Sequence, residues 1–447
     1  MVQGTRVPLL SRTRAVVCLA NVLLLLTACA LAQEVAIDPA VAAQYFREAK
    51  ALSDKDAGAL WGVRLYGPTL LVDPETRAVA ANQADGEGQL KQAGEVFVGK
   101  LPANLPIANT AVRWAGVEWT MIMWPLPRYR QERLRLMMHE SFHRIQEELG
   151  LPAKDSVNNH LDSRNGRVWL ELEWRALTRA LWSTGPARQK AIEDALSFRA
   201  YRRSLFPQGA ASENALEMNE GLAEYTGYAL SSAAPREFEM RAALNVQDAQ
   251  YRQTFVRSFA YVSGPAYGCL LDESKLPWRK LVKKEGDLGV LLASAYGIHL
   301  GPVTESAAVQ RAARYDGDEV ITLERQREAR RQKAIAQYRA LLIDGPVLIL
   351  PLGPNVQWGF DPNNVAALDE NSTVYPTLHL QDEWGTLEVS KGALLVRENG
   401  RLARAQVQAP KDAAAHPVAG DGWTLDLKPG WVLAPGPRAG DFTLKKQ

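Results

Sequence analysis

Hydrophobic residues recur at two different spacings along the chain, and the change of spacing divides it into regions. Before residue 126, short runs rich in β-branched and aromatic residues are separated by Gly and Pro, a pattern typical of strands and turns. These runs are residues 61–72, 77–81, 94–98 and 117–124, and a helical stretch at 39–52 precedes them. The pattern predicts a small, mostly β region over residues 33–125, with a hairpin turn at Asp73-Pro74-Glu75-Thr76.

A helical period replaces this pattern between residues 126 and 345. In the segment 128–149, one helix face carries Leu134, Met137, Met138, Phe142, Ile145 and Leu149. Further segments with helical character are 169–182, 189–204, 212–230, 255–271 and 319–342. From 346 to 447, short strand-like runs return at 347–351, 378–380, 385–389, 393–397, 423–427 and 442–444. The predicted fold class is therefore α+β, with a mainly helical domain at 126–345 followed by a C-terminal β sandwich or barrel-like domain at 346–447.

The first 32 residues have the pattern of an export signal. Three arginines precede an apolar run at residues 15–26, which is shorter than the roughly 18–20 residues that a membrane helix needs. Ala30-Leu31-Ala32 fits ordinary signal peptidase, whereas Leu26-Thr27-Ala28-Cys29 resembles the lipobox of bacterial lipoproteins. We expect an exported protein, periplasmic or secreted, that is either released after residue 32 or attached to a membrane through a lipid on Cys29.

Composition narrows the classes of function. Lysine and arginine number 52 against 50 acidic residues, so no basic field attracts nucleic acid. The 12 Trp and 13 Tyr residues argue against a disordered chain. Because the three cysteines are Cys18, Cys29 and Cys269, at most one unmodified thiol remains after signal removal, and we expect no internal disulfide.

The strongest chemical signal is His139-Glu140-Ser141-Phe142-His143, inside the predicted helix 128–149. Residues four apart share a helix face, so the two imidazoles can bind one Zn²⁺ together, with Glu140 beside them. Zinc lowers the pKa of a bound water toward about 7, and a nearby glutamate can accept the proton of that water. The motif predicts His139 and His143 as metal ligands and Glu140 as general base. The alternative interpretation is a surface helix whose two histidines lie four apart by chance.

A catalytic zinc generally needs a third protein ligand. In residues 219–225, Glu220 and Glu224 fall on one helix face, and Gly221 would let another helix approach closely. Glu220 is therefore the preferred third ligand. Rivals that stay open are Glu171, Glu173 and His160, each of which could instead be a solvated or ion-paired side chain.

The His-Glu-x-x-His motif followed by Asn-Glu-Gly-Leu-Ala-Glu at 219–224 resembles the gluzincin metallopeptidases, the group that contains thermolysin and aminopeptidase N. The resemblance implies a zincin-like catalytic domain, a peptide or protein substrate and Glu220 as third zinc ligand. It also implies that Glu224 orients a ligand histidine from behind. Here Glu220 comes 77 positions after His143, where the family usually has about twenty, so an insertion must loop out, at a cost that grows only logarithmically with length.

Two further likenesses to this family concern substrate contact. Tyr261-Val262-Ser263-Gly264 is similar to the Tyr-x-Lys-Gly element of aminopeptidase N-type enzymes, with Ser263 in place of lysine. The likeness implies that Tyr261 donates a hydrogen bond to the developing oxyanion, with Tyr267 as the alternative donor, although both could be core aromatics. The strand at 119–124 precedes the motif helix, as the substrate-pairing edge strand does in many gluzincins, and a buried core strand would explain its apolar character equally well.

These features predict an exported zinc metallopeptidase that hydrolyses peptide bonds. A different class of function stays open: an exported, non-enzymatic binding protein that keeps the peptidase scaffold and uses its C-terminal β domain. Zinc analysis combined with digestion of a general peptide library separates the two.

Overall fold

A computed structural model of the chain describes residues 37–447 apart from 152, 155 and 362–363. The predicted export signal and both cleavage sites lie outside the described residues. Within the described part of the chain, no helix combines the length and the apolar character that crossing a membrane requires. Helices and sheets are both present, so the α+β class is confirmed, with a β-rich region at the C-terminal end.

The N-terminal region consists of one helix and a six-stranded sheet. Helix α2 (Pro39–Asp56) is capped by the Asp38 side chain, which accepts a hydrogen bond from the Ala40 amide. The sheet has the order β3-β4-β2-β1-β6-β5. Its strands are β1 (Thr69–Val72), β2 (Ala78–Ala81), β3 (Lys91–Ala93), β4 (Val96–Lys100), β5 (Thr110–Trp114) and β6 (Val117–Met123). The predicted hairpin is confirmed, because β1 pairs antiparallel with β2 and Asp73 accepts hydrogen bonds from amides of the turn.

The strand before the motif helix is an interior strand of this sheet. β6 pairs in parallel with β1 and antiparallel with β5, and its residues 119–122 are buried. The expectation that residues 119–124 form the edge strand is therefore wrong, and the interpretation as a buried core strand holds. The edge strand is β5, which the hydrophobic pattern does not predict because most of its residues are partly exposed.

Helix α3 (Arg130–Ile145) opens the helical region and packs against both the sheet and α7. The other helices are α4 (Arg164–Leu181), α5 (Gly185–Leu205), α6 (Gly209–Leu216), α7 (Leu222–Ser231), α8 (Pro235–Ala249), α9 (Ala260–Asp272), α10 (Trp278–Glu285), α11 (Leu288–Tyr296), α12 (Glu305–Ala312) and α13 (Gly317–Arg339). The sequence pattern does not predict α8 or the helices α10, α11 and α12, the last three being too short to show a period. One hydrophobic core joins these helices to the N-terminal region, since Leu71 of β1 and Phe142 of α3 belong to it.

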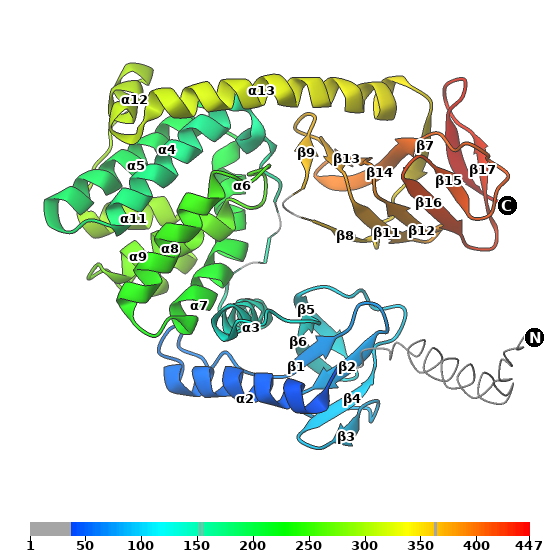
Figure 1. The fold of residues 1–447 in the computed structure, drawn as a ribbon, viewed down its shortest axis with the longest axis horizontal. Coiled ribbons are helices and arrows are strands. Elements are labelled where there is room, and N and C mark those ends of the chain that lie inside the picture. Colours follow the sequence, from blue (N-terminus) through cyan, green and yellow to red (C-terminus); the bar gives the residue numbers. More distant parts are fainter. Residues whose placement is uncertain (1–36, 152, 155, 362–363) are drawn as a thin grey trace, which may run out of the picture.

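The C-terminal region consists of two sheets around a second core, and α13 runs toward it from the helical region (Figure 1). The sheet orders are β17-β18-β7-β14-β13-β10-β9 and β15-β16-β12-β11-β8. The strands are β7 (Val347–Pro351), β8 (Gln357–Phe360), β9 (Ala366–Ala367), β10 (Ser372–Tyr375), β11 (Leu378–Asp382), β12 (Gly385–Val389), β13 (Ala393–Glu398), β14 (Arg401–Gln408), β15 (Val418–Gly420), β16 (Trp423–Leu427), β17 (Trp431–Pro435) and β18 (Phe442–Lys446). Both sheets contribute to the shared core, for example Leu350 from β7 and Leu387 from β12.

Candidate metal centre

Helix α3 carries the three motif residues between the N-terminal sheet and helix α7. His139 and Glu140 are each 4% exposed, and His143 is half-buried. Their spacing along the helix brings the Nε2 atoms of His139 and His143 to 3.1 Å from each other. The two rings thus offer one nitrogen each to a shared position.

Glu220 offers a third atom to the same position. Its Oε2 lies 3.4 Å from the Nε2 atom of each histidine. Ligand atoms about 2.0–2.1 Å from a tetrahedral zinc are separated by about 3.3–3.4 Å, so all three distances suit such an ion. His139, His143 and Glu220 therefore form a buried group that could hold a metal ion.

Glu220 lies in a π-helical turn (Glu217–Gly221) between α6 and α7. The sequence pattern predicts one continuous helix over 212–230, and this turn interrupts it. Because a π turn inserts an extra residue, it changes the direction of the side chains around it, and such turns are frequent at functional sites. The long interval after His143 is filled by α4, α5 and α6, of which α4 and α5 pack against each other, so the insertion does not keep the ligands apart.

Two glycines let α9 cross this turn in backbone contact. A Cβ atom on Gly264 of α9 would lie 2.2 Å from the carbonyl oxygen of Gly221. A Cβ atom on Gly221 would lie 3.4 Å from the Cα of Gly264. The expectation that Gly221 permits a close helix approach is confirmed, and Tyr261, one turn before Gly264, lines the same cavity as Glu220.

Glu224 supports His139 on the side away from the shared position. Its Oε2 lies 2.7 Å from Nδ1 of His139, and its Oε1 forms an ion pair with Arg135. Burial would raise the pKa of Glu224, but Arg135 and His139 lower it below the ordinary value, so the carboxylate stays ionised. A carboxylate in this position fixes the ring and leaves Nε2 as the ligand nitrogen.

Gln146 contacts Nδ1 of His143, as Glu224 contacts Nδ1 of His139. Its Oε1 lies 3.0 Å from Nδ1 of His143, and the side chain is fully buried. Sequence reasoning does not single out Gln146. The available signal is its position three residues after His143 on the same helix face.

Glu140 faces a cavity of about 750 Å³, called the metal cavity below, which His139, His143 and Glu220 also line. Its Oε2 is buried and has no hydrogen-bond partner among the described residues. Burial raises the pKa of Glu140 above its ordinary value. An unsatisfied buried carboxyl oxygen is costly, so the position of Glu140 beside two histidines requires an explanation.

The charge around His139 favours a cation. Burial alone would lower the pKa of His139, but hydrogen bonds to Glu220 and Glu224 outweigh burial and raise the pKa to about 10. The carboxylates therefore stabilise a positive charge at this position, which a divalent ion supplies when it replaces the proton. The donor set, the distances and the charge all fit a bound metal.

Tyr261 lies over the ring of His139, with centroids 5.6 Å apart and ring planes within 5° of parallel. Burial raises the pKa of Tyr261 well above its ordinary value, and Glu220 raises it further, so the phenol keeps its proton and can donate it in a hydrogen bond. The alternative donor, Tyr267, is fully buried, and its hydroxyl donates to Glu173 at 2.8 Å. Of the two tyrosines, Tyr261 is the one that lines the metal cavity.

Two rival third ligands have other partners. Glu173 is completely buried between Arg199 and Arg202. The Nε2 atom of His160 lies 2.9 Å from Oε1 of Glu213. The side chains of Glu173 and His160 are therefore occupied by these partners, away from the two motif histidines.

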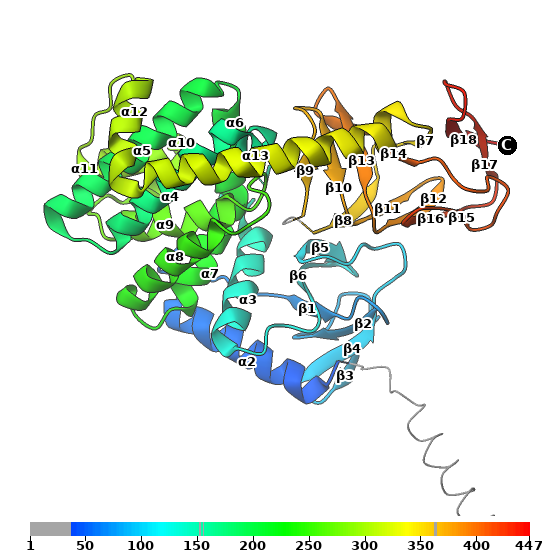
Figure 2. The ribbon, with the colours of Figure 1, turned by 45° about the horizontal axis from the view of Figure 1, so that its top comes forward.

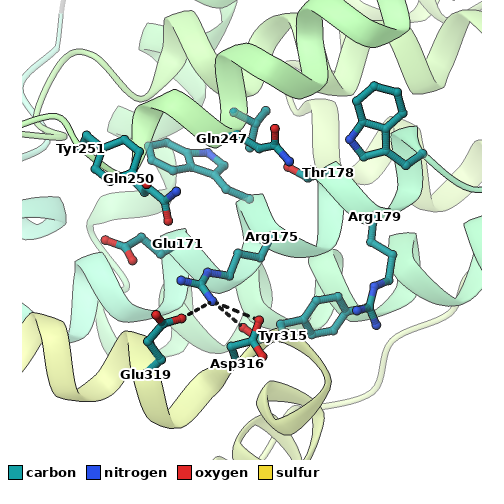
Figure 3. A pocket seen from close by; sticks show the side chains of 13 residues that line it. Glu171, Arg175, Thr178, Arg179, Gln247, Gln250, Tyr251, Tyr315, Asp316 and Glu319 are labelled. Atoms are coloured by element: carbon teal, nitrogen blue, oxygen red, sulfur yellow. Dashed lines mark hydrogen bonds and ion pairs between the residues drawn. The ribbon is translucent and has the colours of Figure 1, made fainter.

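The third rival, Glu171, faces a different cavity of about 550 Å³ that α4, α8 and the start of α13 form (Figure 3). There Arg175 pairs with Asp316 and Glu319, as the dashed lines in Figure 3 show. Burial, with a contribution from the neighbouring Glu324, raises the pKa of Glu171 to about 8. The residues that line this cavity differ from those of the metal cavity.

All three regions of the chain contribute to the metal cavity: residues 108–111 and Met123 from the N-terminal region, several helices from the middle, and Phe360 from the C-terminal sheets.

Comparisons with protein-family models, with curated proteins and with solved structures found no match for this chain. Its function is therefore inferred from the geometry of this centre and from the motif that forms it.

Proposed function

We propose that this chain is a zinc-dependent metallopeptidase with a zincin-like helical domain of the gluzincin type. The observation that carries the proposal is the convergence of His139, His143 and Glu220 beside the buried carboxyl of Glu140. Two imidazoles and one carboxylate are typical of catalytic zinc, which keeps an open position, whereas structural zinc is closed by four protein ligands. The open side of this group faces the metal cavity, where a substrate has room.

The proposed mechanism assigns one task to each side chain. A bound zinc would polarise the scissile carbonyl and bring the pKa of a water toward about 7. Glu140 accepts the proton of the attacking water and delivers it to the leaving amine. Tyr261 donates a hydrogen bond to the oxyanion that develops on the substrate, while Glu224 and Gln146 hold the two histidines in orientation.

Strand β5 supports a peptide as the substrate. It is the edge of the N-terminal sheet, and Thr110 and Ala111 line the metal cavity. An extended peptide can add to such an edge through backbone hydrogen bonds, which do not depend on its sequence. Peptide and protein chains are therefore the proposed substrate class.

The proposal is tested with three variants of the purified chain, measured for zinc content and for digestion of a peptide library. Glu140→Gln should keep one zinc per chain and lose at least about 10³-fold in kcat/KM, because the base is lost while the ligands remain. His143→Ala should lose both zinc and activity. Glu147→Gln, an exposed glutamate in the turn after the same helix, is the matched control and should behave as wild type.

Two results would contradict the proposal. Normal peptide hydrolysis by Glu140→Gln would refute the assigned mechanism. Stoichiometric zinc without cleavage of any library member would favour the non-enzymatic alternative.

We also propose that the protein is exported, on the pattern of residues 1–32. Mass spectrometry of the mature chain distinguishes the two forms, because release leaves an N-terminus at Gln33 and lipidation leaves a modified Cys29. An N-terminus at Met1 on the mature protein would contradict export.

A further inference from the structure

The C-terminal β region reaches the metal cavity through one aromatic ring. Phe360, the last residue of β8, lines this cavity together with the motif residues on α3. β8 is the edge of the five-stranded sheet and β5 is the edge of the N-terminal sheet. In both views of the fold these two edges lie next to each other beside α3 (Figures 1 and 2). Residues of the N-terminal and C-terminal regions therefore line one cavity together.

Two further rings hold Phe360 in place. Trp358 stacks on it with centroids 4.8 Å apart and 16° between the planes. Tyr375 meets it edge-on at 4.9 Å and 84° and is itself 2% exposed in the core between the C-terminal sheets. Stacked and edge-to-face contacts of this kind restrict the orientation of a ring, so Phe360 presents a fixed apolar surface.

Arg257 connects this ring to the metal centre. Its guanidinium carbon lies 5.7 Å from the centroid of Phe360, and its Nη2 lies 3.7 Å from Oε1 of Glu220. A single guanidinium group thus separates Phe360 from a metal ligand. Phe360 and Glu220 therefore contact the same arginine side chain.

Two other large apolar side chains line the metal cavity. Met123 ends β6, and Leu136 lies on α3 one turn before His139 and Glu140. We propose that Phe360, Met123 and Leu136 form an apolar subsite that selects peptides with a large apolar side chain close to the scissile bond. This inference rests on the proposed peptidase function and gives the C-terminal β region a part in substrate selection. A rigid aromatic surface gains affinity from the apolar area that it buries and loses little entropy in doing so.

The test uses the full chain and two peptides that differ only in Phe or Ala beside the cleavage site. Phe360→Ala should lower the ratio of kcat/KM for the Phe peptide over the Ala peptide by about tenfold, within the range that one apolar contact provides. Phe360→Gln, which keeps the length of the side chain, should lower it similarly. Trp431→Ala, a partly exposed ring on β17 of the other sheet, is the control and should leave the ratio unchanged. Zinc content and melting temperature are measured for each variant.

The preference for the Phe peptide over the Ala peptide is also measured as a ratio of binding affinities, in a Glu140→Gln background. This second assay does not depend on turnover. An unchanged ratio in both assays, for a folded and zinc-loaded Phe360→Ala or Phe360→Gln, would overturn the subsite and leave the peptidase proposal intact. If zinc-loaded wild type cleaves no member of the peptide library but the Glu140→Gln background still prefers the Phe peptide through Phe360, the subsite stands and the peptidase proposal fails.

Discussion

Replacing Glu224 with Gln tests how the carboxylate behind His139 contributes to metal binding. Glu224 is ionised, hydrogen-bonded to Nδ1 of His139 at 2.7 Å and paired with Arg135. Glutamine keeps the size and the acceptor oxygen but removes the negative charge that makes the imidazole a stronger ligand. The substitution therefore isolates the electrostatic part of the contact from its geometric part.

The expected loss in zinc affinity is about 10- to 100-fold, the usual effect of removing such a support, which corresponds to about 1.4–2.7 kcal/mol. Glu224→Ala should cost more, because it also leaves the Arg135 guanidinium without its buried partner. Zinc affinity is measured by competition with a chromophoric chelator at fixed pH.

The chain provides a matched control in the exposed pair His379–Glu388, whose Nδ1–Oε1 distance is 2.6 Å. Glu388→Gln alters the same kind of contact far along the chain and should leave zinc affinity unchanged. If Glu224→Gln bound zinc within about twofold of wild type, His139 would not depend on this carboxylate, and the assigned role of Glu224 would be wrong.

Two further predictions concern Tyr261 and Glu171. Tyr261→Phe should lower kcat by about 10²- to 10³-fold with zinc content unchanged, because it removes only the donor to the oxyanion, and full activity in steady-state assays would exclude that role. The pKa of Glu171 is about 8 in the folded chain against an ordinary value of 4.5, so its ionisation destabilises the fold as the pH rises from about 5 through 8. Melting curves should therefore show Glu171→Gln gaining stability over wild type between pH 5 and pH 9, whereas a difference that does not vary with pH would contradict the burial argument.

The sequence predicts the motif helix well, because one amphipathic period and one spacing of four residues define both the helix and the direction of its histidines. The sequence does not exclude Glu173 and His160 as third ligands, because the residues that bind their side chains lie on other helices. The sequence pattern does not predict the π turn at Glu220 either, since this turn changes the backbone without changing the apolar pattern around it.

Two elements of the cavity wall show a second limit of sequence reasoning. Strand β5 is partly exposed along most of its length, so no alternation of apolar and polar residues predicts it. Phe360 lies on a strand of a different sheet from β5, and only the packing of the C-terminal region beside α3 brings it to the motif. Contacts between distant segments are a property of tertiary packing, which a local pattern does not record.

Helix α9 crosses the π turn in main-chain contact, and this contact sets the spacing of two backbones at the candidate metal centre. At Gly221 and Gly264 main chain touches main chain, so the phenol of Tyr261 and the carboxylate of Glu220 are carried by two backbones in direct contact. Rotation about side-chain bonds cannot widen the spacing of those backbones, and a methyl group at Gly264 would force them apart. The spacing of the two backbones that carry Tyr261 and Glu220 is thus set by main-chain contact, and a side chain added at Gly264 would change it directly.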